Sequence, residues 1–451
     1  MQAMTADLSD LLVSVLERAT TRGATAADGF LVEEREFSAS VRLGEVETVT
    51  HSHDQRLSLR VFAGRASAAA STSDLSPASL ERVVDEATRL AKITAADPHA
   101  GLPDPGALID RIPDLELEDV GGDELTPEDK IAIAKRAEAA ALAVDPRIAN
   151  SEGAEYSDRR AHYVYATSSG FAGGYSTSSF SLSVSPVASE NGEMQRDSWY
   201  TVARRRAKLE DPEAVGRTAA ARALRRLGAR KVKTVEVPVI FDAENAAGLI
   251  RSIAGAASGP SLYRRASFLV DRLGSRIAAP SVTIVDDGLI PGALGSKPFD
   301  GEGLPTQRTV LVNEGVLESY LLDTYSARKL GGRSTHHAAR DGSGVTVGTT
   351  NLMLLPGTAT VEELIASVDN GFYVTELIGF GVNGVTGDYS RGAVGIWIEN
   401  GKLAYPVEEV TVAGNLLEMF AAVDGVANDL VLRDRTAAPT LKIAHMVVAG
   451  N

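Results

Sequence analysis

Residues 386–416 constrain the fold more than any other segment, because they alternate β-prone runs with tight turns. Residues 393–398 are apolar and rich in residues that favour strands. Asn400 and Gly401 follow, and both residue types tolerate the positive φ of a hairpin turn. The run after Pro406 is again β-branched. The segment therefore predicts an antiparallel hairpin within a β-rich domain.

A polar segment precedes this hairpin and is the candidate site of the chain. Asp388, Tyr389, Ser390 and Arg391 lie between two glycines. They carry both charge signs, a phenol and a hydroxyl, and glycine lets another backbone approach closely. We expect the four side chains to form one wall of a binding site, where Arg391 could hold a carboxylate. The alternative is an internal ion pair between Arg391 and a neighbouring acid.

The chain resembles the TldD/PmbA family, on its PmbA (TldE) branch, over nearly the whole C-terminal half. The N-terminal half matches more loosely, mainly in residues 41–50 and 57–66. The motifs that carry the resemblance are VIFDAENAAGLI (239–250), YRRASFL (263–269), FDGEG (299–303), LLDTYSARKLGG (321–332), GFYVTELIG (371–379) and the segment up to Asn415.

This resemblance implies metal-dependent proteolysis of unfolded proteins or small peptides by a two-subunit complex. A TldD subunit there carries zinc on a His-Glu-x-x-x-His helix. In this sequence the corresponding place reads Ile-Arg-Ser-Ile-Ala-Gly (250–255), and no histidine or glutamate lies between Asn245 and Pro280. Zinc needs nitrogen, sulfur or carboxylate ligands. The position of a cysteine of the TldD site falls near Gly392. We therefore expect no catalytic residue and no metal on this chain, and zinc on the TldD partner.

The remaining histidines offer two alternative metal sites. His51 and His53 are two residues apart, but the neighbouring Asp54 and Gln55 indicate a loop. His336 and His337 could meet Asp341 only within a loop, because adjacent side chains diverge in regular structure. A polar loop over a cleft is the favoured interpretation of that segment, and an autonomous peptidase site is the alternative. Asp286 and Asp287, at the end of an apolar strand, are interpreted as turn residues.

Composition excludes several classes of protein. The 451 residues contain no cysteine, which rules out thiol catalysis and disulfides. A net charge of −15 opposes binding to nucleic acid and to anionic membranes, and the arginines at 204–206 and 225–230 are interpreted as solvated faces. No apolar run approaches the ~20 residues of a membrane span, and the acidic N-terminus is unlike a signal peptide. We expect a cytoplasmic protein.

The pattern of elements predicts an α+β fold. Its N-terminal α/β unit has an antiparallel sheet and flanking helices, and its C-terminal domain is mostly antiparallel β. We expect domain 1–115, which ends in a proline-rich linker, a central helix and hairpin region at 116–230, and the β-rich domain at 231–451. Helices are expected at 6–22, from Ser76-Pro77, from Thr126-Pro127 to about 144, and at 211–227, with short ones near Glu244, Ala327 and Val361. Strands are expected at 29–43, 46–51, 56–71 and 156–187, with hairpins at 313–315 and 400–401.

Taken with the resemblance, these features predict a TldE-type subunit that forms a heterodimer or larger assembly with a TldD-like protein. The segment 388–391 would then lie at a chamber wall or at the subunit interface. Two other classes stay open. The chain could be a peptidase with its own site near His336, His337 and Asp341, or a non-catalytic homo-oligomeric scaffold that binds peptides. A homodimer is possible when the partner is missing.

Overall fold

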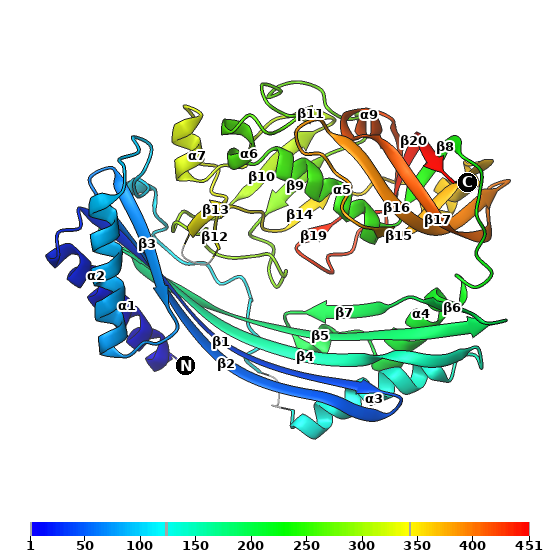
Figure 1. Ribbon diagram of the computed structural model, residues 1–451, viewed down its shortest axis with the longest axis horizontal. Helices are drawn as coiled ribbons and strands as arrows, with labels where there is room; N and C mark the ends of the chain where they lie inside the picture. Colours follow the sequence, from blue (N-terminus) through cyan, green and yellow to red (C-terminus); the bar gives the residue numbers. More distant parts are fainter. Residues whose placement is uncertain (1, 122–124, 342–343, 451) are drawn as a thin grey trace.

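The computed structural model describes residues 2–121, 125–341 and 344–450, with side chains from residue 8 to residue 340 and from 344 on within those ranges. A long curved sheet holds the N-terminal half, and the C-terminal elements lie on its concave side (Figure 1). The α+β class and the antiparallel N-terminal sheet with flanking helices are confirmed. Among the described residues, no helix combines the length and the apolar character needed to cross a membrane.

The curved sheet has the strand order β3-β2-β1-β4-β5-β6, and β7 also pairs with β5. All of its pairings are antiparallel. Its members are β1 (Ala26–Arg42), β2 (Glu45–Ala63), β3 (Ala66–Thr72), β4 (Ile148–Thr167), β5 (Ala172–Glu190), β6 (Glu193–Arg196) and β7 (Trp199–Ala203). The division at residues 115 and 230 stays a prediction, but strands from both sides of residue 115 share this sheet.

The loop expected at Asp54 and Gln55 is wrong, because β2 continues through these residues without a break. They pair with Glu34 and Glu33 of β1. The imidazole of His53 lies 2.7 Å from the Glu33 carboxylate, so a cross-strand pair supports the polar part of the strand. Pairing with β1 therefore keeps Asp54 and Gln55 in an extended strand, although their residue types suggested a loop.

Two helix pairs cover the sheet ends. Helices α1 (Gln2–Thr21) and α2 (Pro77–Ile93) pack their leucines and valines on β1 to β3. Helices α3 (Pro127–Leu142) and α4 (Pro212–Leu224) pack on β4 and β5. Thr126 caps α3 as expected, in a capping box with Asp129. Ser76 does not cap α2 through its side chain, because its hydroxyl bonds Asp74 instead.

The predicted linker is an extended arm between the sheet and the C-terminal domain. Up to residue 121 it contains one short turn of 3₁₀-helix, η1 (Pro105–Ala107). The backbone of Ile109 donates to Gly303, and that of Leu117 accepts from Ser178 of β5. The arm therefore bonds both halves of the molecule and fixes their relative position.

The C-terminal domain contains two larger sheets and a small hairpin. The first sheet has the order β17-β16-β15-β8-β20-β18 and the second β11-β10-β9-β14-β19. Helix α5 (Ala243–Ala256) contributes to the core that both sheets share. The expected turns are present, with positive φ at Glu314 and Gly315 and at Asn400 and Gly401.

The bounds of the first sheet are β8 (Val235–Phe241), β15 (Asn370–Ile378), β16 (Asp388–Glu399), β17 (Lys402–Asn415), β18 (Val423–Val426) and β20 (Leu441–Ala449). The second contains β9 (Ile284–Asp287), β10 (Arg308–Asn313), β11 (Val316–Leu317), β14 (Leu352–Leu354) and β19 (Thr436–Ala437). The hairpin is β12 (Ala338–Asp341) with β13 (Gly344–Val347), and the short helices are η2 (Arg206–Lys208), α6 (Gly259–Tyr263), α7 (Thr324–Lys329), α8 (Val361–Ala366) and α9 (Leu416–Ala421).

Candidate functional site

The four residues predicted as a site wall begin strand β16, where their side chains alternate between two faces. Asp388 and Ser390 are exposed, whereas Tyr389 is buried in the hydrophobic core. Arg391 donates to the carbonyl of Leu377 at 3.1 Å, and among the described residues it forms no ion pair. The Thr386 hydroxyl bonds the Asp388 carboxylate at 2.6 Å and lowers the pKa of that group. The segment lines none of the cavities described below, and its role stays a prediction.

An exposed apolar loop lies beside this segment. Residues 379–387 connect β15 to β16, and the Gly381 carbonyl accepts the Ser390 backbone N–H at 2.7 Å. The apolar side chains at and next to the loop point to solvent, with Phe380 fully exposed. Ile378, Val382 and Val385 are exposed by 54%, 40% and 54%. Exposed apolar patches of this kind typically contact another protein.

The two adjacent histidines are separated by their hydrogen bonds. His337 is 2% exposed and lies between the Asp286 carboxylate at 3.2 Å and the Thr335 hydroxyl at 2.9 Å. His336 turns away, with a φ of 60°, and its Nδ1 bonds the carbonyl of Pro305. The side chain of Asp341 lies outside the described residues. Within the described part of the chain, no three histidine, aspartate or glutamate residues are grouped as a metal site would require.

Helix α5 contains residues 250–255, which we expected to correspond to the zinc helix of a TldD subunit. Asp242 caps its N-terminus through the backbone N–H of Asn245. Ile250 and Ile253 are buried in the core, and Arg251 is exposed. Alkyl and guanidinium groups do not ligate zinc. Residues 250–255 of this helix therefore do not fit the metal.

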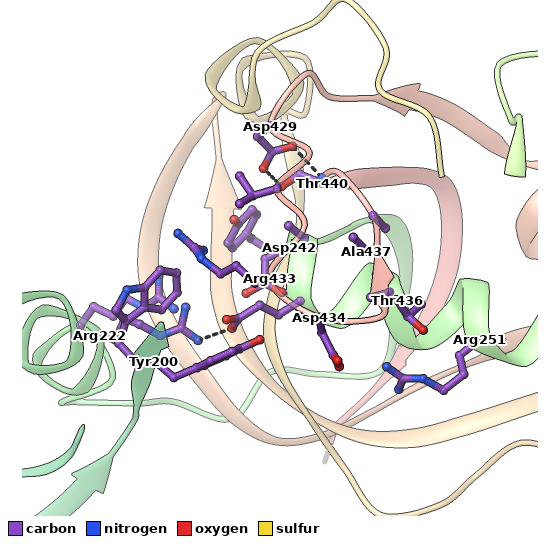
Figure 2. Close-up of a pocket in the computed structure, with 18 residues that line it drawn as sticks. Tyr200, Arg222, Asp242, Arg251, Asp429, Arg433, Asp434, Thr436, Ala437 and Thr440 are labelled. Atoms are coloured by element: carbon purple, nitrogen blue, oxygen red, sulfur yellow. Dashed lines mark hydrogen bonds and ion pairs between the residues drawn. The ribbon is translucent and has the colours of Figure 1, made fainter. Parts of the chain in front are cut away.

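A cavity of about 460 Å³ opens between the curved sheet and the N-terminal half of α5. Its walls come from β7, α4, α5, β15 and the segment around β19 (Figure 2). Figure 2 shows the Arg222 guanidinium bonded to a carboxylate, which is Glu244 at 3.1 Å, and Asp429 bonded to Thr440. The lining is Trp199, Tyr200, Arg222, Arg225, Asp242, Ala243, Glu244, Ala247, Arg251, Tyr373, Asp429, Val431, Arg433, Asp434, Thr436, Ala437, Ala438 and Thr440.

The polar groups of this cavity are held by the packing around them. The indole of Trp199 contacts two guanidinium groups, that of Arg433 at 4.3 Å from the ring centre and that of Arg222 at 5.2 Å. Burial raises the pKa of Asp242 to about 6, although its hydrogen bonds with Asn245 oppose this shift. A wall with both charge signs, an indole and phenols can bind peptide termini and side chains. Sequence patterns did not predict this cavity, because the residues of its walls lie far apart in the sequence.

A buried ionic cluster joins the curved sheet to the C-terminal domain. Asp28 of β1 is 0% exposed, and both of its oxygens accept from Arg60 of β2, at 2.9 and 2.8 Å. Arg340 of β12 donates to the same carboxylate, and Arg60 also reaches Glu302 at 3.2 Å. Although burial raises it, the charges of Arg340 and Arg60 lower the pKa of Asp28 to about 2. The sequence signal for this cluster is a charge inside an apolar run, as in the segment LSLRVF around Arg60.

Comparison with known proteins places the chain in one family. Models of the PmbA/TldA metallopeptidase match in three consecutive parts: domain 1 at residues 27–91, the central domain at 121–227 and the C-terminal domain at 234–450. Metalloprotease PmbA of Escherichia coli O157:H7 is 40% identical over 92% of this chain and 90% of its own length. The metalloprotease PmbA homolog of Haemophilus influenzae is 37% identical over 100% of this chain and 98% of its own.

Solved structures agree with this relationship. A proposed modulator of DNA gyrase from Bacteroides thetaiotaomicron superposes with a TM-score of 0.91 at 30% identity, covering 98% of both chains. TldE from Thermococcus kodakarensis superposes with a TM-score of 0.87 over 98% of this chain and 100% of that one, and at 22% identity it shows the shared fold alone. The chain therefore belongs to the PmbA/TldD metallopeptidase family, on its PmbA (TldE) branch.

Proposed function

We propose that this chain is the subunit of a TldD-TldE peptidase that does not hold the zinc. Its TldD-like partner carries the metal, and this chain completes the chamber in which unfolded proteins or small peptides are cleaved. The observation that supports this assignment is helix α5, which carries Ile250, Arg251 and Ile253 where a zinc helix needs imidazoles and a carboxylate. The complex acts in the cytoplasm, in peptide maturation or degradation.

Enclosure explains why a subunit without metal ligands would be retained. A chamber that admits only extended chains protects folded proteins from cleavage, and it shields the partner's metal-bound water from bulk solvent. The cavity at α5 contributes binding surface to this chamber. The cavity carries groups of both charge signs and an indole, so it does not select a single type of substrate side chain. This lining suits substrates of varied sequence.

The partner contact is assigned to the loop between β15 and β16 together with the exposed side chains of Asp388 and Ser390. Phe380 is fully exposed there, and Ile378, Val382 and Val385 extend the apolar area around it. Burying one phenylalanine side chain stabilises a complex by about 1.5–3 kcal/mol. Replacing it with an acid therefore weakens association by at least about tenfold.

The test replaces Phe380 with aspartate and measures binding to the TldD-like protein of the same organism by analytical ultracentrifugation. Ile93→Asp is the matched control, because Ile93 is 71% exposed at the end of α2, in a different part of the fold. We expect the Phe380 variant to lose association and the Ile93 variant to keep it. Equal association of both variants would refute the assigned contact. If the wild-type chain does not bind the TldD-like protein and forms only homo-oligomers, the proposed function is overturned. That result would favour a non-catalytic homo-oligomeric scaffold.

A further inference from the structure

A smaller cavity, of about 260 Å³, lies between the curved sheet and the loop before β10, and its charge is strongly unbalanced. Among the described residues, five cationic side chains line it against a single acid, in a chain whose net charge is −15. The cations are Arg159, Arg204, Lys297, Arg340 and Arg435, and the acid is Asp300. Grouped cations without matching anions repel one another, so this arrangement favours a bound anion.

Within the described ranges, carboxylates neutralise two of the five cations. Arg159 pairs with Glu34, and Arg340 pairs with Asp28. Arg204, Lys297 and Arg435 have no ion pair among the described residues. Three formal positive charges therefore remain around the cavity, of which Lys297 is the weakest, because burial lowers its pKa and its Nζ donates to the carbonyl of Ala338 at 3.4 Å.

Arg204 is fixed in place by neutral acceptors. Its Nη1 donates to the carbonyl of Ser178 at 3.0 Å and its Nη2 to that of Leu294 at 2.6 Å. Carbonyl oxygens orient the guanidinium but do not cancel its charge. Burial and the nearby charge of Arg435 lower the pKa of Arg204 to about 10, so the group stays cationic at neutral pH.

Arg340 supplies a donor without an acceptor. Its side chain is 4% exposed. Nε donates to the carbonyl of Gly301 at 2.7 Å and Nη2 donates to Asp28, but Nη1 is buried and has no hydrogen-bond partner among the described residues. A buried charged donor without a partner is costly. An oxyanion in the adjoining cavity would provide the missing acceptor.

The one acid among the described lining residues does not balance these charges. Asp300 accepts the backbone N–H groups of Glu302 and Leu304 on one oxygen and that of Ala338 on the other. Burial, together with the negative charge of Glu302, raises the pKa of Asp300 to about 7. Its carboxyl is therefore partly neutral at physiological pH, and both of its oxygens already have protein partners.

Aromatic rings also line the cavity. Tyr163 and Tyr175 stack with ring centres 5.1 Å apart, and the Phe299 ring meets Tyr175 edge-on at 5.3 Å. Phe30 is the fourth ring, and the Arg340 guanidinium lies over it, 5.8 Å from the ring centre. We propose that the cavity is an oxyanion site that binds a small organic carboxylate or phosphate carrying an apolar or aromatic group. The inference is independent of which subunit holds zinc.

Calorimetric titration of the full-length chain tests this site with four probes. N-acetylphenylalanine offers a terminal carboxylate, as a peptide does, and its amide is the neutral control. Phenyl phosphate and inorganic phosphate separate a phosphate ligand from a carboxylate one and measure the aromatic contribution. We expect saturable binding of an aromatic anion that weakens with salt, and no binding of the amide. Equal binding of the amide and the acid, or no saturable binding of any anion, would overturn the proposal.

Two variants locate the binding. Arg435→Met and Lys297→Met each remove one unpaired cation while keeping an unbranched side chain, and each should weaken anion binding at least about tenfold. Arg272→Met is the matched control, because Arg272 is exposed and lines none of these cavities. Affinity within twofold of wild type is expected for this control. Arg435 is itself exposed, so its variant should fold even if that of Lys297 does not. Equal affinities of Arg435→Met and Arg272→Met would overturn the proposal.

Discussion

Replacing Asp28 with asparagine should destabilise the protein more than any surface charge substitution. The change keeps the size of the side chain but leaves Arg60 and Arg340 without their shared carboxylate, in a place where Asp28 is 0% exposed. Removing one partner of a buried ion pair costs about 3–5 kcal/mol. Because the cluster joins β1 and β2 to β12, the curved sheet and the C-terminal domain should also lose part of their mutual contact.

The pH dependence of this contribution follows from the pKa of Asp28. The folded state lowers that pKa from 3.8 to about 2. Since the carboxyl is more acidic when folded, its stabilisation is fully present above about pH 5 and disappears as the pH falls through 4 toward 2. A shift of this size corresponds to about 2 kcal/mol. The stability difference between wild type and Asp28→Asn should therefore shrink over this interval.

Urea denaturation, followed by tryptophan fluorescence, measures both effects. Asp145→Asn is the control, because the pKa of Asp145 is also lowered to about 2, through its hydrogen bonds with Arg147 at the surface. Exposed pairs contribute little to stability. We expect a large drop in the urea midpoint for Asp28→Asn and a small one for Asp145→Asn at pH 7. Equal drops would refute the reasoning that burial gives the Asp28 cluster its strength.

Two further predictions concern helix α5 and the exposed loop. Burial raises the pKa of Asp242 to about 6, so its ionisation weakens the fold as the pH rises from 4 through 6. Asp242→Asn keeps a good N-cap and should remove this loss, which makes the variant more stable than wild type at pH 8 by up to about 2–3 kcal/mol in thermal or urea unfolding. Gly381→Ala places a Cβ 1.6 Å from the Ser390 carbonyl and should cost about 1–3 kcal/mol. Gly384→Ala meets no atom within 4 Å and should be nearly neutral, and equal unfolding midpoints for the two alanine variants would contradict this packing.

Local sequence signals predicted most of the elements. Thr126 with Asp129 marked a helix start, and Asn400 with Gly401 marked a hairpin, because each signal acts within a few residues. The prediction of a break inside β2 was wrong, because a contact between residues far apart in the sequence decides the structure there. His53 is held in the strand by Glu33, twenty residues earlier, and no local pattern reports such a pair.

The candidate sites were harder to predict than the fold. The cavities and the buried ionic cluster assemble residues hundreds of positions apart, such as Asp28 and Arg340. One feature of the sequence could have indicated the ionic cluster, namely a charged residue inside an apolar strand, like Arg60. Burying such a charge destabilises the protein unless the charge has a partner. Segment 388–391 was chosen for its residue types and its role stays a prediction, whereas its alternating burial follows from its place on β16.

Measuring zinc content tests most directly the proposal that the TldD-like partner, and not this chain, holds the metal. Elemental analysis of this chain alone, of its TldD-like partner alone and of the purified complex should be combined with cleavage of an unstructured peptide. We expect little zinc and no cleavage for this chain alone, and near-stoichiometric zinc with cleavage for the complex. Near-stoichiometric zinc and cleavage in the isolated chain would contradict this proposal, and the region of His336 and His337 would then be the first to mutate.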